Sequence, residues 1–131
     1  MAVLYVVLNA VLLFATPATN LMVSISAPQD NAVVPHRPFV EGTVSDNTAS
    51  IFVIVHPMET SEYWVEPKPT VRKNGIWRVQ IYVGDAGAAH KGKHFEVMAV
   101  ANAQRKLKEG QKLDDWPSAQ ARSEVLEVVR R

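Results

Sequence analysis

The chain of 131 residues contains no cysteine, which excludes disulfides, zinc–thiolate sites, iron–sulfur clusters and thiol nucleophiles. Net charge is also nearly absent, because 14 lysine and arginine residues are offset by 13 aspartate and glutamate residues. Such a balance gives no field that steers a protein toward nucleic acid, so we expect no nucleic-acid partner. A third absence is that of any long stretch with the 3.6-residue period of an amphipathic helix.

A long uncharged stretch stands at the start of the sequence. Residues 2–15 are apolar apart from Asn9, and no lysine or arginine precedes Arg37. This length matches the hydrophobic region of a signal peptide, and extension to Val23 reaches the ~20 residues that span a bilayer. This run has three possible interpretations: a cleavable signal peptide, a retained membrane helix, or a buried element of a soluble protein. The missing basic residues disfavour the signal, so we expect residues 1–21 to form a hydrophobic helix in a membrane, with the apolar positions Val3, Leu4, Val7, Leu8, Val11, Leu12 and Phe14.

Beyond this run the sequence changes to short alternating stretches. GIWRVQIYVG, residues 75–84, places Trp77, Val79, Ile81 and Val83 on alternate positions between two glycines. This period of two predicts a strand with one face in a core and the other in water. Trp77 is therefore expected in the core.

Other stretches complete an all-β pattern. SIFVIVHP, residues 50–57, is a continuous apolar run, as expected for a central strand covered on both faces. Pro67 and Pro69 interrupt the pieces that follow, which favours an edge position because proline donates no backbone hydrogen bond. About seven short strands separated by turn signals predict an antiparallel β-sandwich or barrel.

Residues 102–122 form a connection that is long for a compact domain. Its end, DDWPSAQAR at residues 114–122, combines aspartates, a proline and helix-tolerant residues, which predicts one or two helical turns. We expect Leu107, Leu113 and Trp116 to hold this segment against the sandwich.

Four stretches between residues 24 and 101 resemble strands of one known protein family. SISAPQDNAVV and FVEGTVSD are similar to the first and second strands of a known family. NGIWRVQIYV resembles its strand in which a tryptophan, here Trp77, fills the centre of a sandwich, and HFEVMAVA resembles the strand that follows. The family is that of bacterial immunoglobulin-like domains. The resemblance covers residues 22–130 and implies an immunoglobulin-like antiparallel β-sandwich of about seven strands, with residues 22–131 as its domain.

Two departures from the family pattern stand out. Asn31 replaces the usual glycine of the first turn, a change that a left-handed turn tolerates. The 102–122 segment is longer than a typical loop between the last two strands, so features specific to this chain are expected there. The fold hosts adhesins, enzyme accessory modules and periplasmic subunits, and it implies no single activity.

Histidine and acidic residues form no catalytic motif. His90 and His94 have a helical ligand spacing, yet they flank a loop that leads into a strand. His56 ends the central apolar run and is expected to cap a core edge. Asp114 and Asp115 point apart in an extended chain and fit a turn or a helix cap. We therefore expect no enzyme activity, no metal and no cofactor.

Aromatic side chains are the candidate binding residues. Tyr63 and Trp64 point to opposite faces of an extended chain, so one of them is expected to be exposed, and Trp116 lies in the long connection. Exposed tyrosine and tryptophan mark protein interfaces and sugar-binding surfaces, although they also simply cover the edge of a sandwich. We take Tyr63, Trp64 and Trp116 as candidate partner-binding residues.

The sequence thus leads to a functional expectation. We expect a non-catalytic accessory or protein-interaction subunit, in which residues 1–21 tether the immunoglobulin-like domain to a bacterial membrane or membrane complex. The domain would lie on the periplasmic or extracellular side, and its partners would be protein chains of a larger membrane-associated assembly. A carbohydrate-binding module that uses exposed aromatic residues is the alternative, and an enzyme is a third reading.

Overall fold

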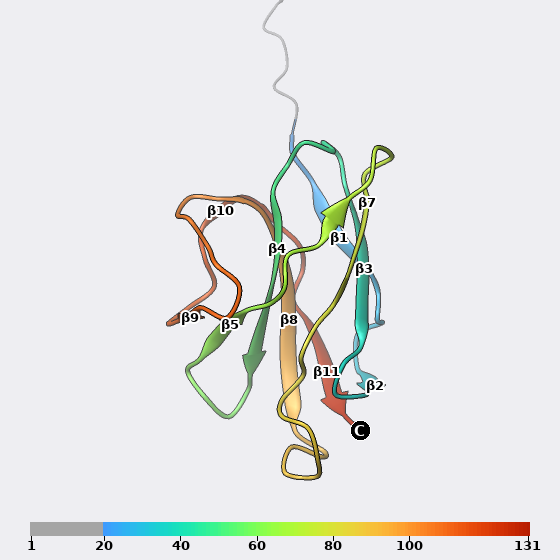
Figure 1. Cartoon of the computed structure of the whole chain (residues 1–131), viewed down its shortest axis with the longest axis vertical. Coiled ribbons are helices and arrows are strands. Elements are labelled where there is room, and N and C mark those ends of the chain that lie inside the picture. Colours follow the sequence, from blue (N-terminus) through green and yellow to red (C-terminus); the bar gives the residue numbers. More distant parts are fainter. Residues whose placement is uncertain (1–19) are drawn as a thin grey trace, which may run out of the picture.

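Residues 20–131 are described by a computed structural model, and this part of the chain is all-β (Figure 1). It contains no helix, and hence none that could span a membrane. The predicted membrane positions between Val3 and Phe14 lie outside the described residues. Asn20 and Leu21, which end the predicted helical segment, are not helical, and Leu21 packs against the core.

The strands are more numerous than the sequence predicts. Eleven occur in residues 20–131: β1 Val23–Ala27, β2 Ala32–Val34, β3 Phe39–Val44, β4 Ile51–Pro57, β5 Tyr63–Val65, β6 Thr70–Val71, β7 Ile76–Gln80, β8 His94–Ala103, β9 Lys112–Leu113, β10 Ala119–Arg122 and β11 Leu126–Arg130. The expected number of about seven was too low because several strands have only two to four residues. So short a segment carries almost no alternating pattern.

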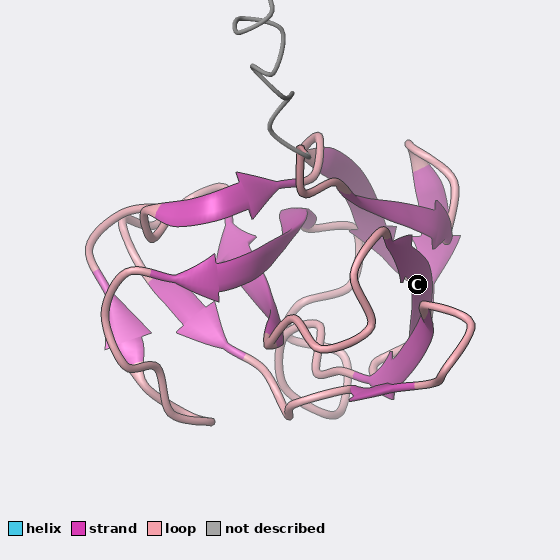
Figure 2. Ribbon diagram, turned by 90° about the horizontal axis from the view of Figure 1, so that it is seen from above, coloured by secondary structure: helices cyan, strands magenta, loops and turns pink. Residues whose placement is uncertain are grey.

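Two sheets form a sandwich around one core (Figures 1 and 2). The first sheet has the order β1-β3-β7-β6, and the second has the order β2-β11-β8-β4-β5-β9, with β10 also paired to β8. All neighbours are antiparallel except β2 and β11, which run parallel. The predicted antiparallel sandwich is therefore confirmed at the level of two packed sheets. Pro67 and Pro69 precede β6, the edge strand of the first sheet, as the sequence predicts.

The main core lies between the sheets and confirms the alternation in residues 75–84. Trp77, Val79, Ile81 and Val83 are buried, whereas Tyr82 is 47% exposed. Trp77 is fully buried among apolar residues of both sheets, which include Val23, Val40, Val44, Ile51, Val53, Val55, Phe95, Val97, Ala99 and Val128.

The turn at Asn31 also follows the expectation. Asn31 has a φ of 69°, in the left-handed region that asparagine tolerates and most residues avoid. Its backbone N–H donates to the carbonyl of Glu127, 2.6 Å away, at the point where β2 meets β11. The turn therefore sets where the parallel pair begins.

The packing of Trp77 requires a glycine at position 42. The two residues are directly opposite each other in the β3–β7 pair. A Cβ at position 42 would lie 2.0 Å from the carbonyl oxygen of Ser24 and 2.3 Å from Cζ2 of Trp77. The indole thus packs over a backbone that has no side chain.

We expect Gly42→Ala to lower the free energy of unfolding by roughly 1–3 kcal/mol, because the added methyl overpacks the core. Urea unfolding followed by Trp fluorescence measures the change. Gly87→Ala is the control for replacement of a glycine, since a Cβ there meets no atom within 4 Å, although its φ of 90° adds strain of its own. A Gly42→Ala protein as stable as the wild type would show that the indole lies elsewhere.

A second apolar cluster covers the outer face of the second sheet. Ile54, Met98 and Val100, on β4 and β8, pack there against Leu107 and Leu113 of the long connection. Trp116 packs against the same cluster, so the prediction that these three residues hold the segment is confirmed. The double cover explains why residues 51–55 of β4 and residues 97–101 of β8 are continuous apolar runs.

The prediction of helical turns at residues 114–122 is wrong. Residues Ala119–Arg122 form β10, in which Ala119 pairs with Ala103 and Ala121 with Ala101. The ten-residue β8 extends beyond β11 on the edge that faces away from β4, and it offers unpaired backbone groups there to this segment. Ladder hydrogen bonds there outweigh a weak local helix propensity.

Candidate functional site

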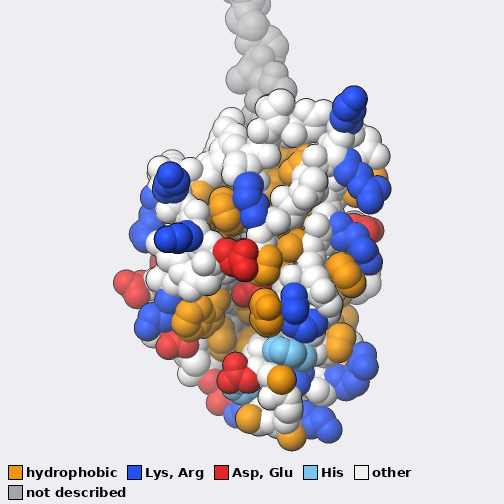
Figure 3. Space-filling model, in the orientation of Figure 1, with side chains coloured by type: hydrophobic (Ala, Val, Ile, Leu, Met, Phe, Trp, Pro, Cys, Tyr) orange, Lys and Arg blue, Asp and Glu red, His pale blue; other side chains and the backbone are white. Residues whose placement is uncertain are grey.

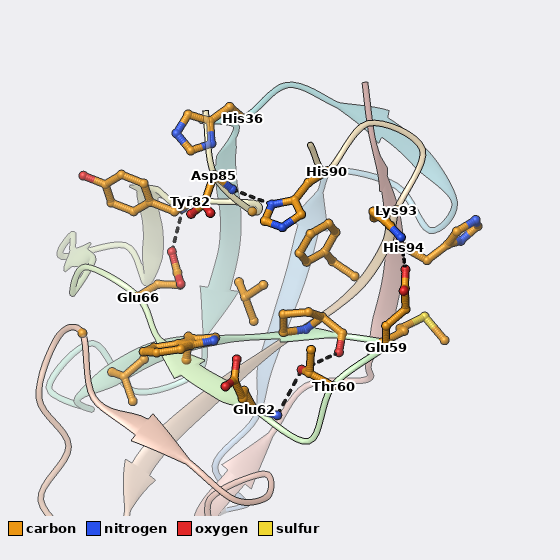
Figure 4. Close-up of a pocket in the computed structure, with 18 of the residues that line it drawn as sticks. His36, Glu59, Thr60, Glu62, Glu66, Tyr82, Asp85, His90, Lys93 and His94 are labelled. Carbon is orange, nitrogen blue, oxygen red and sulfur yellow. Dashed lines mark hydrogen bonds and ion pairs between the residues drawn. The ribbon is translucent and has the colours of Figure 1, made fainter. Parts of the chain in front are cut away.

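A pocket of about 830 Å³ opens between the two sheets, and most of its lining residues are drawn in Figure 4. One wall comes from β4, β5 and the residues after β5, and the facing wall comes from segment 82–86, which follows β7. The loop residues His90 and Lys93 and the start of β8 close the far side. In Figure 3 histidine and acidic side chains gather in the lower half of the visible face, with hydrophobic side chains among them.

Glu66 is the buried acid of this pocket. It follows β5, and its backbone N–H donates to the carbonyl of Val53 at 2.9 Å, which fixes its place beside β4. The residue is only 5% exposed. Its Oε1 accepts the backbone N–H of Tyr82 at 2.6 Å, so the carboxyl group links the second sheet to the continuation of the first (Figure 4).

The environment of Glu66 favours its neutral form. Burial raises the pKa of the carboxyl group from 4.5 to about 7, and the charge of Glu109 acts in the same direction. The Tyr82 N–H and the charge of Arg37 oppose this rise without cancelling it. Arg37 is itself engaged, since its Nε donates to the carbonyl of Ile81 at 3.0 Å and its guanidinium lies 3.8 Å from the Tyr82 ring centre.

The charged side chains of the pocket are predominantly acidic. Glu59, Glu62, Glu66, Asp85 and Glu109 line it, together with a single lysine, Lys93. Lys93 is already paired with Glu59 at 2.7 Å. The pocket therefore has an excess of carboxylate over ammonium groups.

Two of the three histidines that line the pocket are held by hydrogen bonds to other residues. Nδ1 of His90 accepts the backbone N–H of Asp85 at 2.8 Å, and Nδ1 of His94 lies in contact with Glu127. His36 lines the opposite wall, and its Nδ1 is buried without a hydrogen-bond partner among residues 20–131. Within the described part of the chain, no group of three or more histidine, aspartate or glutamate side chains is arranged to hold a metal ion.

Arg130 positions the rim of the pocket. This buried residue of β11 donates to the carbonyl oxygens of Val83, Asp85 and Gly87, at 3.1, 2.6 and 2.9 Å. Carbonyl oxygens at the rim are thus held by a guanidinium from the other sheet. Segment 83–87 has no regular secondary structure, and these three bonds fix its path.

The structure separates the three predicted aromatic residues. Tyr63 and Trp64 point to opposite faces of β5, as the alternation predicts, and both are half-buried. Trp64 lines the pocket. Tyr63 stacks on His56 at 4.0 Å between ring centres and meets Trp116 edge-on at 4.9 Å, on the outer face of the sheet.

His56 lies beside this aromatic pair. Its Nδ1 is 2.8 Å from a carboxylate oxygen of Glu96, and its Nε2 is 2.8 Å from the carbonyl oxygen of Thr60. The residue is therefore fixed on both sides and closes the end of β4, which agrees with its expected place at a core edge.

Sequence reasoning missed Glu66, Tyr82 and His36. The signal for Glu66 lies in its spacing, because Trp64 and Glu66 are two residues apart and share a face of an extended chain. The alternation in residues 75–84 places Tyr82 only on the solvent side of a strand. Its contact with Glu66 comes from the approach of two sheets, which no local pattern contains.

No protein family, curated protein or solved structure matches this chain.

Proposed function

We propose that this chain is a non-catalytic interaction subunit: an immunoglobulin-like domain held at a bacterial membrane or membrane complex by its hydrophobic N-terminal segment, residues 1–21. The domain lies on the periplasmic or extracellular side and binds protein partners of a larger assembly. The pocket beside Trp64 and Glu66, open to solvent and lined by aromatic and acidic side chains, is the observation that carries the binding role.

The order of the strands supports the immunoglobulin-like fold. In that fold, strands A, B, E and D form one sheet, and G, F, C and C′ form the other. Here β1-β3-β7-β6 and β11-β8-β4-β5 follow those two orders, also in their sequence along the chain. The tryptophan differs, since Trp77 lies on β7, in the place of strand E, whereas antibody domains carry theirs on strand C.

Side-chain contacts support a binding role over catalysis. In residues 20–131 the histidine ring nitrogens bond to carboxylates, to a backbone carbonyl and to a backbone N–H, but to no serine or threonine hydroxyl. A hydroxyl nucleophile needs such a base within hydrogen-bond reach. Glu66 is buried, and it bonds the backbone through one carboxyl oxygen only. The other oxygen is left for a ligand, which suits recognition.

A carbohydrate-binding module is the second candidate, favoured by Trp64 in the pocket. Sugar rings stack on flat aromatic platforms, but the planes of Tyr63 and Trp116 are inclined by 71°. These two residues therefore offer no common plane, and Trp64 faces the opposite side of the sheet. The arrangement of the aromatic residues therefore supports the carbohydrate-binding hypothesis less well than the sequence alone does.

Membrane fractionation tests the tether. We expect the full chain to stay with membranes after carbonate and salt washes, because an exposed apolar run of this length requires a cover. A chain that lacks residues 1–19 is the control and should be soluble and melt cooperatively. The deletion stops at residue 19 because Leu21 packs on the core and the Met22 N–H donates to Ser45 Oγ at 2.9 Å.

The same preparation tests the interaction. After extraction in mild detergent, we expect the full chain to elute in a stoichiometric complex with another protein chain. A full chain that is recovered with its N-terminus intact as a soluble monomer would contradict both the tether and the subunit role.

A further inference from the structure

Glu66 is the residue from which a ligand can be inferred. It is buried and lines the pocket, and in residues 20–131 its carboxyl group makes one hydrogen bond, through Oε1 to Tyr82. None of the ion pairs in the described part of the chain includes it. Its second oxygen, Oε2, therefore has no bonded donor in the protein. Figure 4 shows the carboxyl group between Tyr82 and the segment after β5 that carries Glu66.

The free oxygen of Glu66, Oε2, can be reached by a cation from the pocket, since it is not among the buried polar atoms that lack a hydrogen-bond partner in residues 20–131. Buried charges in proteins are paired and hydrogen-bonded, because an isolated one is costly to desolvate. Arg37, the cation whose charge acts on Glu66, is held by the Ile81 carbonyl and the Tyr82 ring. Lys93 is held by Glu59. The protein thus leaves the partner of Glu66 to be supplied from outside.

The remaining walls match an organic cation with an apolar stem. Trp64 provides an aromatic surface beside the carboxylates, and tryptophan is the best aromatic partner for a guanidinium or ammonium group. Pro57, Met58 and Phe95 provide apolar surface for the stem. Glu62, Asp85 and Glu109 add negative charge around the opening.

We propose that this pocket binds the side chain of an arginine or lysine presented by the partner protein, with Glu66 as its ion partner and Trp64 as its aromatic wall. The proposal rests on the interaction role proposed above and adds the chemistry that the partner must present. A guanidinium forms two parallel hydrogen bonds to a carboxylate, so arginine fits better than lysine.

The test uses capped amino acids as probes of the purified full chain in mild detergent. N-acetyl-arginine methylamide, the lysine analogue and N-acetyl-citrulline methylamide are titrated by calorimetry at pH 8. Citrulline has nearly the shape of arginine but no charge. We expect the arginine probe to bind at least tenfold more tightly than the citrulline probe, with lysine between them.

Variants assign the binding to the pocket. Glu66→Gln keeps an acceptor for the Tyr82 N–H but removes the charge, and we expect it to weaken arginine binding about ten- to hundredfold. Trp64→Leu should weaken it about three- to thirtyfold. Glu124→Gln is the matched control, since Glu124 is exposed and does not line the pocket. Thermal melting of each variant reports whether it is folded.

The pH dependence gives an independent readout. If the cation binds only ionised Glu66, affinity at pH 5.5 should be about thirtyfold lower than at pH 8.5, given the pKa of about 7. Binding at pH 7 should release about half a proton from Glu66. The charged and titratable groups around the pocket are Arg37, His36, His90, His94, Lys93, Glu59, Glu62, Asp85 and Glu109. The pH profile of Glu66→Gln isolates the share of these other groups.

Several outcomes would overturn the proposal. Equal affinity for the arginine and citrulline probes, or an unchanged affinity in Glu66→Gln, would exclude recognition of the charge. Tighter binding of free agmatine than of the capped arginine would indicate a small-molecule site, and binding of methyl glucoside alone would indicate a sugar site. Each of these results leaves membrane fractionation and complex formation unaffected, so failure here is distinct from failure of the interaction role.

Discussion

Trp77→Ala is expected to lower the free energy of unfolding by ~3–5 kcal/mol, the cost of emptying a large aromatic site in a core. The indole is fully buried between the sheets and packs over Gly42. Gly42, the residue directly opposite on β3, has no side chain that could move into the space that the alanine leaves. Collapse of the cavity is therefore limited, which favours the upper part of this range.

Denaturant unfolding of residues 20–131, monitored by circular dichroism, measures the effect. Arg78→Ala is the matched control on the same strand, since Arg78 is exposed and its contact with Glu41 spans 3.4 Å at the surface. Trp77→Phe separates volume from polarity, because Nε1 of Trp77 is buried without a hydrogen-bond partner among residues 20–131. A loss below about 1 kcal/mol in Trp77→Ala would mean that the faces of this strand are reversed.

The second large effect is a pH dependence of stability that Glu66 creates. The folded protein raises the pKa of this carboxyl group to about 7 from its ordinary 4.5, mainly through burial. The folded state thus binds the proton more tightly than the unfolded state. The stabilisation is fully present below pH 4.5 and is lost as the pH rises through 7. At 1.36 kcal/mol per pKa unit, the loss amounts to roughly 3 kcal/mol.

Comparison with Glu66→Gln isolates this contribution. The difference in unfolding free energy between wild type and variant, measured from pH 4 to pH 8.5, cancels the other titrating groups. We expect this difference to shift by roughly 3 kcal/mol in favour of the variant as the pH rises. Glu124→Gln should follow the wild type throughout. Parallel curves for Glu66→Gln and wild type would show that Glu66 is solvated in the folded protein.

The sequence predicts the inner core better than the edges of the sheets. Trp77, Val79 and Ile81 alternate within one strand, so burial of one face leaves a local pattern that can be read directly. The segment Ala119–Arg122 has no such pattern, since its pairing depends on an unoccupied stretch of β8 nearly twenty residues earlier. Strand pairing over such distances is a property of the assembled sheet.

Only some residues of the pocket could be predicted from the sequence. Trp64 could be singled out as an aromatic residue on one face of a short strand, and the pocket includes it. Tyr63 and Trp116 were grouped with it by residue type, but they lie on the outer face of the sheet. Glu66 gains its properties from burial against the segment of Tyr82, which belongs to the other sheet. Burial of that kind follows from tertiary packing.

The position of β11 has a consequence for biosynthesis. β11, Leu126–Arg130, lies between β2 and β8, and its Arg130 fixes segment 83–87 at the pocket. A nascent chain therefore cannot join β2 to its sheet, or shape the pocket rim, before these late residues leave the ribosome. Until then the apolar flank of β8 is bare and open to aggregation or chaperone binding. The rim of the pocket is therefore complete only after residues 126–130 have emerged from the ribosome and β11 has joined its sheet.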